Sequence, residues 1–194
     1  MSLPPPADPH ARLLSIVYAS PWMMAALAAV RELGLESWCI GAGAVRNLVW
    51  DALHGHQLPS ALADIDVAYF DTAALGPERE AALQERLAQI LPGQPWEVCN
   101  QAAVHLWFES CFGYPVAPLQ SLEEAVASWP EYATAVALTM QPDGTVDIIA
   151  PYGLGDLFDI VVRRNPARVS VDTYRRRVAR KGYAERWPRV TILP

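Results

Sequence analysis

Two aspartates separated by one residue are the part of the sequence best suited to chemistry. The segment Asp64-Ile65-Asp66-Val67 alternates acidic and apolar residues inside a strand predicted at residues 64–70. Neighbouring side chains of a strand point to opposite faces, so both aspartates share one face while the apolar residues enter the core. Two half-buried carboxylates repel each other, and a divalent cation relieves that repulsion. Because Mg²⁺ prefers carboxylate oxygens and substrate phosphates, the pair predicts a Mg²⁺ (or Mn²⁺) site; two solvated aspartates on an edge strand are the alternative.

A turn rich in glycine precedes the aspartates. Gly41-Ala42-Gly43 connects a predicted buried strand, residues 37–41, to a predicted helix, residues 44–53. The glycines allow close backbone approach, and a helix start offers unpaired N–H groups with partial positive charge. These features suit a phosphate, to which Arg46 could add a bidentate contact. The spacing is neither a Rossmann fingerprint nor a Walker A loop, so a helix start that needs small residues for packing is the alternative.

A third carboxylate could complete an acidic site. Glu97 stands between Trp96 and Val98 in a predicted strand at residues 96–100, a pattern that directs the acid to one face of a sheet. Asp147 has the same local pattern in a later predicted hairpin and is the rival. Either acid could instead face solvent.

The elements that position these residues alternate between helices and strands. Further helices are predicted at 21–33, from Pro77 to 91, from a capping box at Ser121, and near 172–181, with a hairpin formed by 133–140 and 145–150. Residues 101–108 fit either an extended or a helical segment. This order predicts an α+β fold, a mixed β-sheet with flanking helices, followed by a C-terminal hairpin and helical arm. We expect a disordered tail at 1–10 and one domain at 11–194, with a core at about 20–110 and an extension at about 111–194.

Composition and charge narrow the classes of protein. With 194 residues, 52% hydrophobic and 19% charged, most of the chain is not intrinsically disordered, and a net charge of −6 argues against a simple basic nucleic-acid binder. Residues 163–189 nevertheless hold nine arginines and Lys181 against two acids, a net +8, so the rest carries −14. This arm could contact a triphosphate or an RNA backbone through Arg175, Arg176, Arg177, Arg180 and Lys181. Alternatively, these arginines could lie across the acidic body or stay solvated. We favour this structural interpretation, because no aromatic stacking surface is interleaved with most of them.

The cysteines and the apolar N-terminal stretch indicate in which cellular compartment the protein is expected. The three cysteines are odd in number and far apart, which fits neither a disulfide framework nor a zinc site, so we expect reduced thiols in a cytoplasmic protein. The apolar residues 13–30 are interrupted at Ser20-Pro21, which is typical of the start of a soluble helix. We therefore expect no membrane partner.

The order of these elements resembles the nucleotidyltransferase fold of the DNA polymerase β superfamily. More closely, the chain resembles a family of uncharacterised, nucleotidyltransferase-like bacterial proteins. That closer resemblance covers almost everything after the N-terminal tail and rests on five segments: GAVRNLVW at 43–50, DIDVAYFD at 64–71, NQAAVHLW at 100–107, ATAV at 133–136 and APYGLGDLF at 150–158.

The resemblance implies a function and a set of site residues. It implies an Mg-dependent nucleotidyltransferase that moves a nucleoside monophosphate from an NTP to an acceptor, which could be a small molecule, a protein or RNA. Asp64 and Asp66 carry over as the metal ligands and Glu97 as the third catalytic acid. The nucleotide-binding residues it implies are Gly41, Gly43, Ala44, Arg46 and Asn47.

One departure from the family pattern opens an alternative. The superfamily has a glycine followed by Gly or Ser at the turn, whereas here Gly41-Ala42 or Gly43-Ala44 must serve. A catalytically silent module on the same fold, which binds a nucleotide or a protein partner, is therefore the second reading. Three polar residues after Glu97 are weaker candidates for the site. Asn100 and Gln101 could contact a base or ribose, or they could cap the end of the strand. His105 could contact substrate, or it could be a half-buried, hydrogen-bonded histidine.

Overall fold

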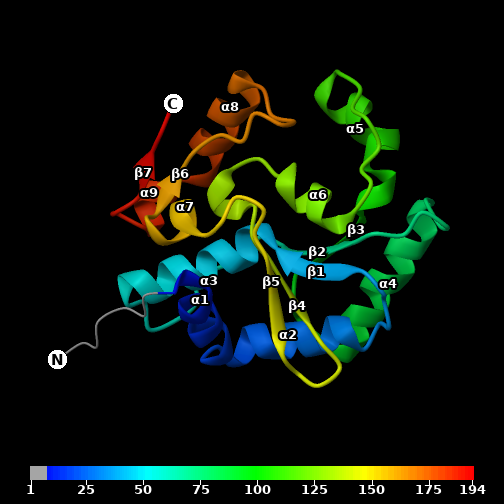
Figure 1. Cartoon of the computed structure of the whole chain (residues 1–194), viewed down its shortest axis with the longest axis horizontal. Helices are drawn as coiled ribbons and strands as arrows, with labels where there is room; N and C mark the ends of the chain where they lie inside the picture. The colour runs from blue at the N-terminus through cyan, green and yellow to red at the C-terminus, as the bar shows by residue number, and fades with distance from the viewer. Residues whose placement is uncertain (1–7) are drawn as a thin grey trace.

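A mixed five-stranded sheet forms the centre of the protein (Figure 1). A computed structural model describes residues 8–194. The strands lie in the order β3-β2-β1-β4-β5, with β2 and β3 parallel and every other pair antiparallel. Their bounds are β1 (Trp38–Gly41), β2 (Ile65–Tyr69), β3 (Trp96–Asn100), β4 (Ala137–Met140) and β5 (Val146–Ile149). The mixed sheet with flanking helices confirms the predicted α+β class.

One face of the sheet carries the main core. Helices α2 (Pro21–Arg31), α3 (Ala42–His54) and α4 (Pro77–Ile90) contribute to it, and α2 and α4 lie below the sheet in Figure 1. Ile65 and Val67 of β2 are both buried in this core, as the alternation of the strand predicted. Their burial leaves Asp66 on the opposite face.

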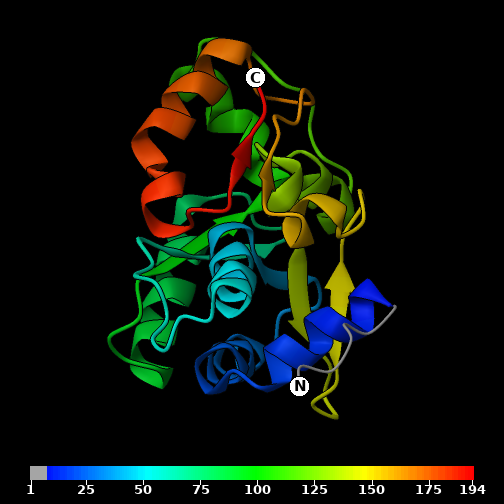
Figure 2. The same cartoon turned by 90° about the vertical axis from the view of Figure 1, so that its left-hand side faces the viewer.

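The opposite face is covered only in part. Cys39, Ala68 and Ala137 pack against Leu122 and Val126 of α6 (Leu122–Ala127) in a smaller apolar cluster. Helices α5 (Val104–Phe112) and α8 (Val171–Lys181) lie farther out on the same side. Figure 2 shows α8 and the C-terminal strands above the sheet, while α1 (Pro9–Tyr18) and α2 lie below it.

Local capping signals decide where several helices begin. The Ser20 hydroxyl accepts a hydrogen bond from the Met23 N–H at 3.4 Å, and Pro21 is the first residue of α2. The Ser121 hydroxyl accepts from the Glu124 N–H at 3.1 Å at the start of α6. The helices predicted from these signals are confirmed, as are the helix from Pro77 and the arm helix.

Three segments differ from the sequence expectations. The undecided segment 101–108 is helical, with a 3₁₀ turn at Gln101–Ala103 followed by α5. Residues 133–136 are not a strand: a 3₁₀ turn at Tyr132–Thr134 precedes β4, because the Thr134 side chain bonds back to Glu131. The predicted tail lies outside the described residues at 1–7, whereas Asp8 caps α1, which begins at Pro9.

The apolar residues 13–30 form two helices rather than one. Within the described residues, no single helix is long and apolar enough to cross a membrane. Helices α1 and α2 together have sufficient length and apolar character, but the chain bends by 89° between them.

A buried glutamate attaches the basic arm to the body. Glu131 is 1% exposed and accepts hydrogen bonds from Arg177 Nε at 2.6 Å, the Thr134 hydroxyl at 3.0 Å and the Tyr183 hydroxyl at 3.2 Å. Tyr183 belongs to α9 (Tyr183–Arg186), which follows α8 directly. The chain ends in β7 (Thr191–Ile192), which pairs in parallel with β6 (Val161–Val162). These contacts fix α8 above the sheet face that carries Asp66.

Candidate active site

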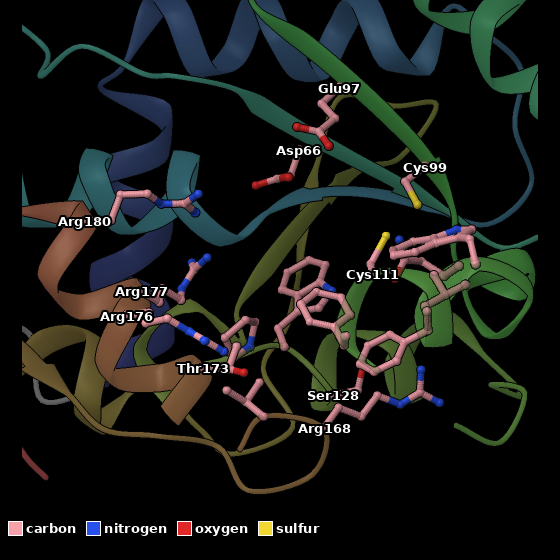
Figure 3. Close-up of a pocket in the computed structure, with 18 residues that line it drawn as sticks. Asp66, Glu97, Cys99, Cys111, Ser128, Arg168, Thr173, Arg176, Arg177 and Arg180 are labelled. Carbon is pink, nitrogen blue, oxygen red and sulfur yellow. The ribbon is translucent and has the colours of Figure 1, made fainter. Parts of the chain in front are cut away.

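Asp66 and Glu97 lie side by side on neighbouring strands. They are register partners in the parallel pair β2 and β3, and register partners project to the same face of a sheet. Figure 3 shows both carboxylates at the same end of a cavity. Of the two acids that the sequence left open, the fold brings Glu97 to Asp66.

The rival acid lies elsewhere in the sheet. Asp147 is exposed on β5, the outermost strand on the other side, with β1 and β4 between it and β2. Its carboxylate accepts a hydrogen bond from the Gln141 side chain within the hairpin. Asp147 therefore does not join the site, although its local sequence pattern matches that of Glu97.

The environment of Asp66 opposes its negative charge. The pKa of its carboxyl is raised to about 6, chiefly by burial and then by the neighbouring charges of Asp64 and Glu97. Arg177 and Lys181 of the basic arm lower it and so offset part of that effect. Three carboxylates within electrostatic reach of one another, one of them mostly buried, form a site that favours a cation.

Asp64 lies between β2 and the start of α3. It directly precedes β2, which begins at Ile65, one residue later than predicted. A Cβ atom on Gly43 would lie 3.9 Å from Asp64 Oδ1 and 3.8 Å from an Arg46 nitrogen, so these three residues adjoin one another. Lys181 is also close enough for the charge of Asp64 to raise its pKa, although burial lowers it more. Asp64 thus connects the acid pair to the start of α3.

The glycines of the turn have separate roles. A Cβ on Gly41 would overlap the Trp129 ring, so this glycine provides room for packing. Gly43 is the glycine beside Asp64, where a phosphate could approach the backbone. Ala42 has φ 50°, the left-handed region that favours glycine. The turn therefore departs from the family pattern at Ala42, a detail that sequence spacing did not identify.

The α3 residues proposed to bind nucleotide are mostly buried. Ala44 is fully buried, and Arg46 and Asn47 are 3% and 2% exposed. One Arg46 nitrogen donates to Asn47 Oδ1 at 2.6 Å, and the guanidinium carbon lies 5.1 to 5.7 Å from the ring centres of Trp50, Tyr183 and Trp187. Arg46 Nε and Nη1 have no hydrogen-bond partner within residues 8–194. Arg46 thus places a positive charge behind the helix start rather than extending into solvent.

The donor set fits a hard divalent cation. Asp64, Asp66 and Glu97 offer carboxylate oxygens, which Mg²⁺ and Mn²⁺ accept. Within residues 8–194, no three His, Cys, Asp or Glu side chains converge closely enough to hold a metal by themselves. This suits Mg²⁺, which is commonly held by one or two carboxylates together with substrate phosphates and water.

The polar residues after Glu97 lie in different surroundings, and not all of them can contact a ligand. Asn100 is fully buried: its side-chain oxygen accepts from Asp71 N and Ala102 N, and its amide donates to the carbonyls of Asp71 and Ala74. Every polar atom of its side chain is occupied, so a base or ribose contact is wrong for this residue.

Gln101 and His105 follow Asn100 on the chain but face different surroundings. Gln101 lines the cavity beside Cys99. His105 is absent from the lining, and its Nδ1 is buried without a hydrogen-bond partner in the part of the chain described. Gln101 therefore lies at the cavity, whereas His105 does not line it and its Nδ1 lacks the hydrogen bond expected of a half-buried histidine.

A cavity of about 630 Å³ opens beside the acids. Asp66 and Glu97 line one end (Figure 3), and the α8 residues Arg176, Arg177 and Arg180 line one wall. The lining also includes the α5 aromatics Trp107, Phe108 and Phe112, with Arg168 beside them, its guanidinium carbon 5.8 Å from the Phe108 ring centre. The sequence shows no aromatic stacking surface interleaved with most of the arginines of the arm. The fold nevertheless sets α5 against α8, so the two kinds of side chain face one cavity.

The arginines of the arm divide between contacts with the body and the lining of the cavity. Arg177 pairs with the buried Glu131, and Arg163 pairs with Asp156. Arg176 and Arg180 instead line the cavity.

Comparison with known proteins decides the family. A family model described as nucleotidyltransferase matches residues 28–192. The chain belongs to this nucleotidyltransferase family. None of the curated protein sequences matches the chain. The family match confirms both the resemblance drawn from the motifs and the prediction that the chain is a nucleotidyltransferase.

Solved structures agree with this family. The nucleotidyltransferase chain is 30% identical to a protein whose NMR structure is described as revealing a CCA-adding enzyme head domain, with a TM-score of 0.79, covering 94% of this chain and 95% of that one. A CCA-adding enzyme in complex with CTP matches with 15% identity and a TM-score of 0.58, over 96% of this chain and 43% of that one. The Thermotoga maritima CCA-adding enzyme complexed with tRNA matches with 15% identity and a TM-score of 0.56, over 95% and 42%. The nucleotidyltransferase chain thus spans less than half the length of these two enzymes, which share its fold.

Proposed function

We propose that this nucleotidyltransferase moves a nucleoside monophosphate from an NTP to an acceptor hydroxyl in a Mg²⁺-dependent reaction. The observation that carries the proposal is the register pairing of Asp66 with Glu97, next to Asp64 at the start of α3. Structures of CCA-adding enzymes with CTP and with ATP share the fold, which supports an NTP as donor.

Each side chain has a role in this reaction. Asp64 and Asp66 would hold Mg²⁺, which when bound neutralises charge on the phosphates. The start of α3 and Lys181 supply positive charge beside the triphosphate, and the buried Arg46 adds positive charge from behind the helix start. The acceptor oxygen attacks the α-phosphorus, the bond from that phosphorus to the bridging oxygen breaks, and pyrophosphate leaves. The hydroxyl proton passes to the Glu97 carboxylate.

Label transfer tests the proposal. The protein is incubated with Mg²⁺, a cell extract and ATP labelled at either the α- or the γ-phosphate. The α-label should enter a new product and the γ-label should appear in pyrophosphate, and Asp66→Asn should abolish both. Asp147→Asn is the matched control, since Asp147 is an exposed strand acid outside the site. Release of inorganic phosphate in place of pyrophosphate would show a phosphohydrolase instead.

A catalytically silent nucleotide-binding module is the second candidate, and Ala42 is the observation that favours it. A left-handed alanine places a methyl group where the superfamily has Gly or Ser, in the turn that precedes Gly43. Nucleotide binding without any label transfer would support this second function. Under the enzyme proposal, Ala42→Gly should retain or increase label transfer.

A further inference from the structure

The cavity and the start of α3 adjoin the acids through different residues. Asp66 and Glu97 line the cavity, whereas Gly43, Asp64 and Lys181 are not among its described lining residues. Asp64 adjoins Gly43, so we assign the triphosphate to the start of α3 and leave the cavity for the acceptor. In phosphoryl transfer the attacking and leaving oxygens lie roughly in line on opposite sides of phosphorus. If pyrophosphate leaves towards α3, the acceptor must approach from the cavity.

One wall of the cavity is aromatic and partly open. Trp107 and Phe112 of α5 are 40% and 45% exposed, although large aromatic side chains are usually buried. Phe108 lies between them in the sequence, with its ring centre 4.4 Å from that of Phe112. Trp129 lines the cavity as well. A planar apolar group placed against these rings would cover surface that water now contacts.

The other wall is cationic. Arg176, Arg177 and Arg180 of α8 line it, with the two carboxylates at the cavity end. Arg177 is engaged by Glu131, whereas Arg176 and Arg180 form no ion pair within residues 8–194. Guanidinium groups left in this condition favour a ligand with an anionic group.

We propose that the acceptor is a small molecule that carries a planar apolar ring, an anionic group and the hydroxyl that receives the nucleotide; this inference rests on the proposed function. The ring lies on the α5 aromatics, the anionic group pairs with Arg176 and Arg180, and the hydroxyl lies at Asp66 and Glu97. The cavity of about 630 Å³ is within the usual range of small-molecule sites.

Charge argues for a small anion over a nucleic acid. A strand of RNA would extend past the cavity onto the rest of the protein, and the chain outside residues 163–189 has a net charge of −14 in total. That charge repels a phosphate backbone but not a ligand confined between α5 and α8.

Fluorescence titration with 8-anilinonaphthalene-1-sulfonate, a planar aromatic anion, tests the inference without catalysis. We expect one dye per chain, with affinity at least tenfold weaker for Phe112→Ala and for Arg176→Gln. Leu106→Ala and Arg175→Gln are matched controls, because both residues are exposed on the same two helices but do not line the cavity, and they should bind like wild type. Equal losses in controls and test variants, or no saturable binding, would overturn the inference.

Competition separates this inference from the proposed function. Mg²⁺ with a non-hydrolysable ATP analogue should bind without displacing the dye, and Asp64→Asn should lose the nucleotide while it keeps the dye. Displacement of the dye by the nucleotide would assign the cavity to the donor, and displacement by a short RNA oligonucleotide would assign it to nucleic acid; either would overturn the small-molecule acceptor. Dye binding without nucleotide binding would instead contradict the proposed function alone.

Discussion

Replacing Asp66 with asparagine should make the metal-free protein more stable at neutral and alkaline pH. Asp66 is mostly buried next to Asp64 and Glu97, and its pKa is raised from 3.8 to about 6. The folded protein therefore binds the Asp66 proton more tightly than the unfolded chain does. The cost of ionising this buried acid is fully present above pH 6 and disappears as the pH falls below 3.8. Asparagine has no charge and avoids that cost.

The size of the effect follows from the two pKa values. A difference of about two pKa units corresponds to about 3 kcal/mol at pH 8, at 1.36 kcal/mol per unit. At pH 5 the Asp66 carboxyl of the folded wild-type protein is largely protonated, so the destabilisation is about 1.4 kcal/mol smaller than at pH 8. The advantage of Asp66→Asn over wild type should therefore shrink by about 1.4 kcal/mol between pH 8 and pH 5.

Urea denaturation at both pH values, with a chelator present, measures this change. The chelator is needed because a bound cation would relieve the repulsion around Asp66 in the wild-type protein. Asp147→Asn is the matched control, since Asp147 is exposed and lies on the far strand β5. The difference in free energy of unfolding between Asp147→Asn and the wild-type protein should be the same at pH 5 and pH 8. An advantage of Asp66→Asn that stays constant or grows from pH 8 to pH 5 would refute the reasoning.

Three further substitutions test the scaffold around the site. Ala42→Gly should raise the free energy of unfolding by about 1 kcal/mol by removing left-handed backbone strain, and an unchanged melting temperature would contradict this. Gly41→Ala should lower it by about 2 kcal/mol, because the new methyl group overlaps Trp129; wild-type stability in urea would contradict the packing. Glu131→Ala should lower it by about 4 kcal/mol and expose α8 to limited proteolysis, because Arg177 loses its buried partner; an uncut α8 would contradict that attachment.

The sequence predicted those parts of the fold that depend on local signals. Ser20-Pro21 and Ser121 marked helix starts, and the alternation around Asp66 correctly assigned one face of β2 to the core. Helix α1 was not predicted at all, because Asp8-Pro9 followed a run of prolines that suggested a tail. The helical state of α5 was left open, since its apolar residues fit more than one period.

The site depended more on pairings that no local pattern contains. Glu97 and Asp147 share the same apolar–acid–apolar pattern, and only the strand order places one beside Asp66 and the other at the far edge. Gly41 and Gly43 also differ only in what the fold packs against them, Trp129 for one and Asp64 for the other. The cavity walls come from α5 and α8, which are far apart along the chain, so their combination was visible only once the arm was in place.

Calorimetric titration with Mg²⁺ and a non-hydrolysable ATP analogue tests most directly whether the two aspartates hold a metal-bound nucleotide. Wild-type protein should bind one nucleotide per chain with Mg²⁺ present and lose that binding in a chelator. The double variant Asp64→Asn/Asp66→Asn should give no binding heat under either condition. Equal heats from the wild-type protein and the double variant would contradict the account.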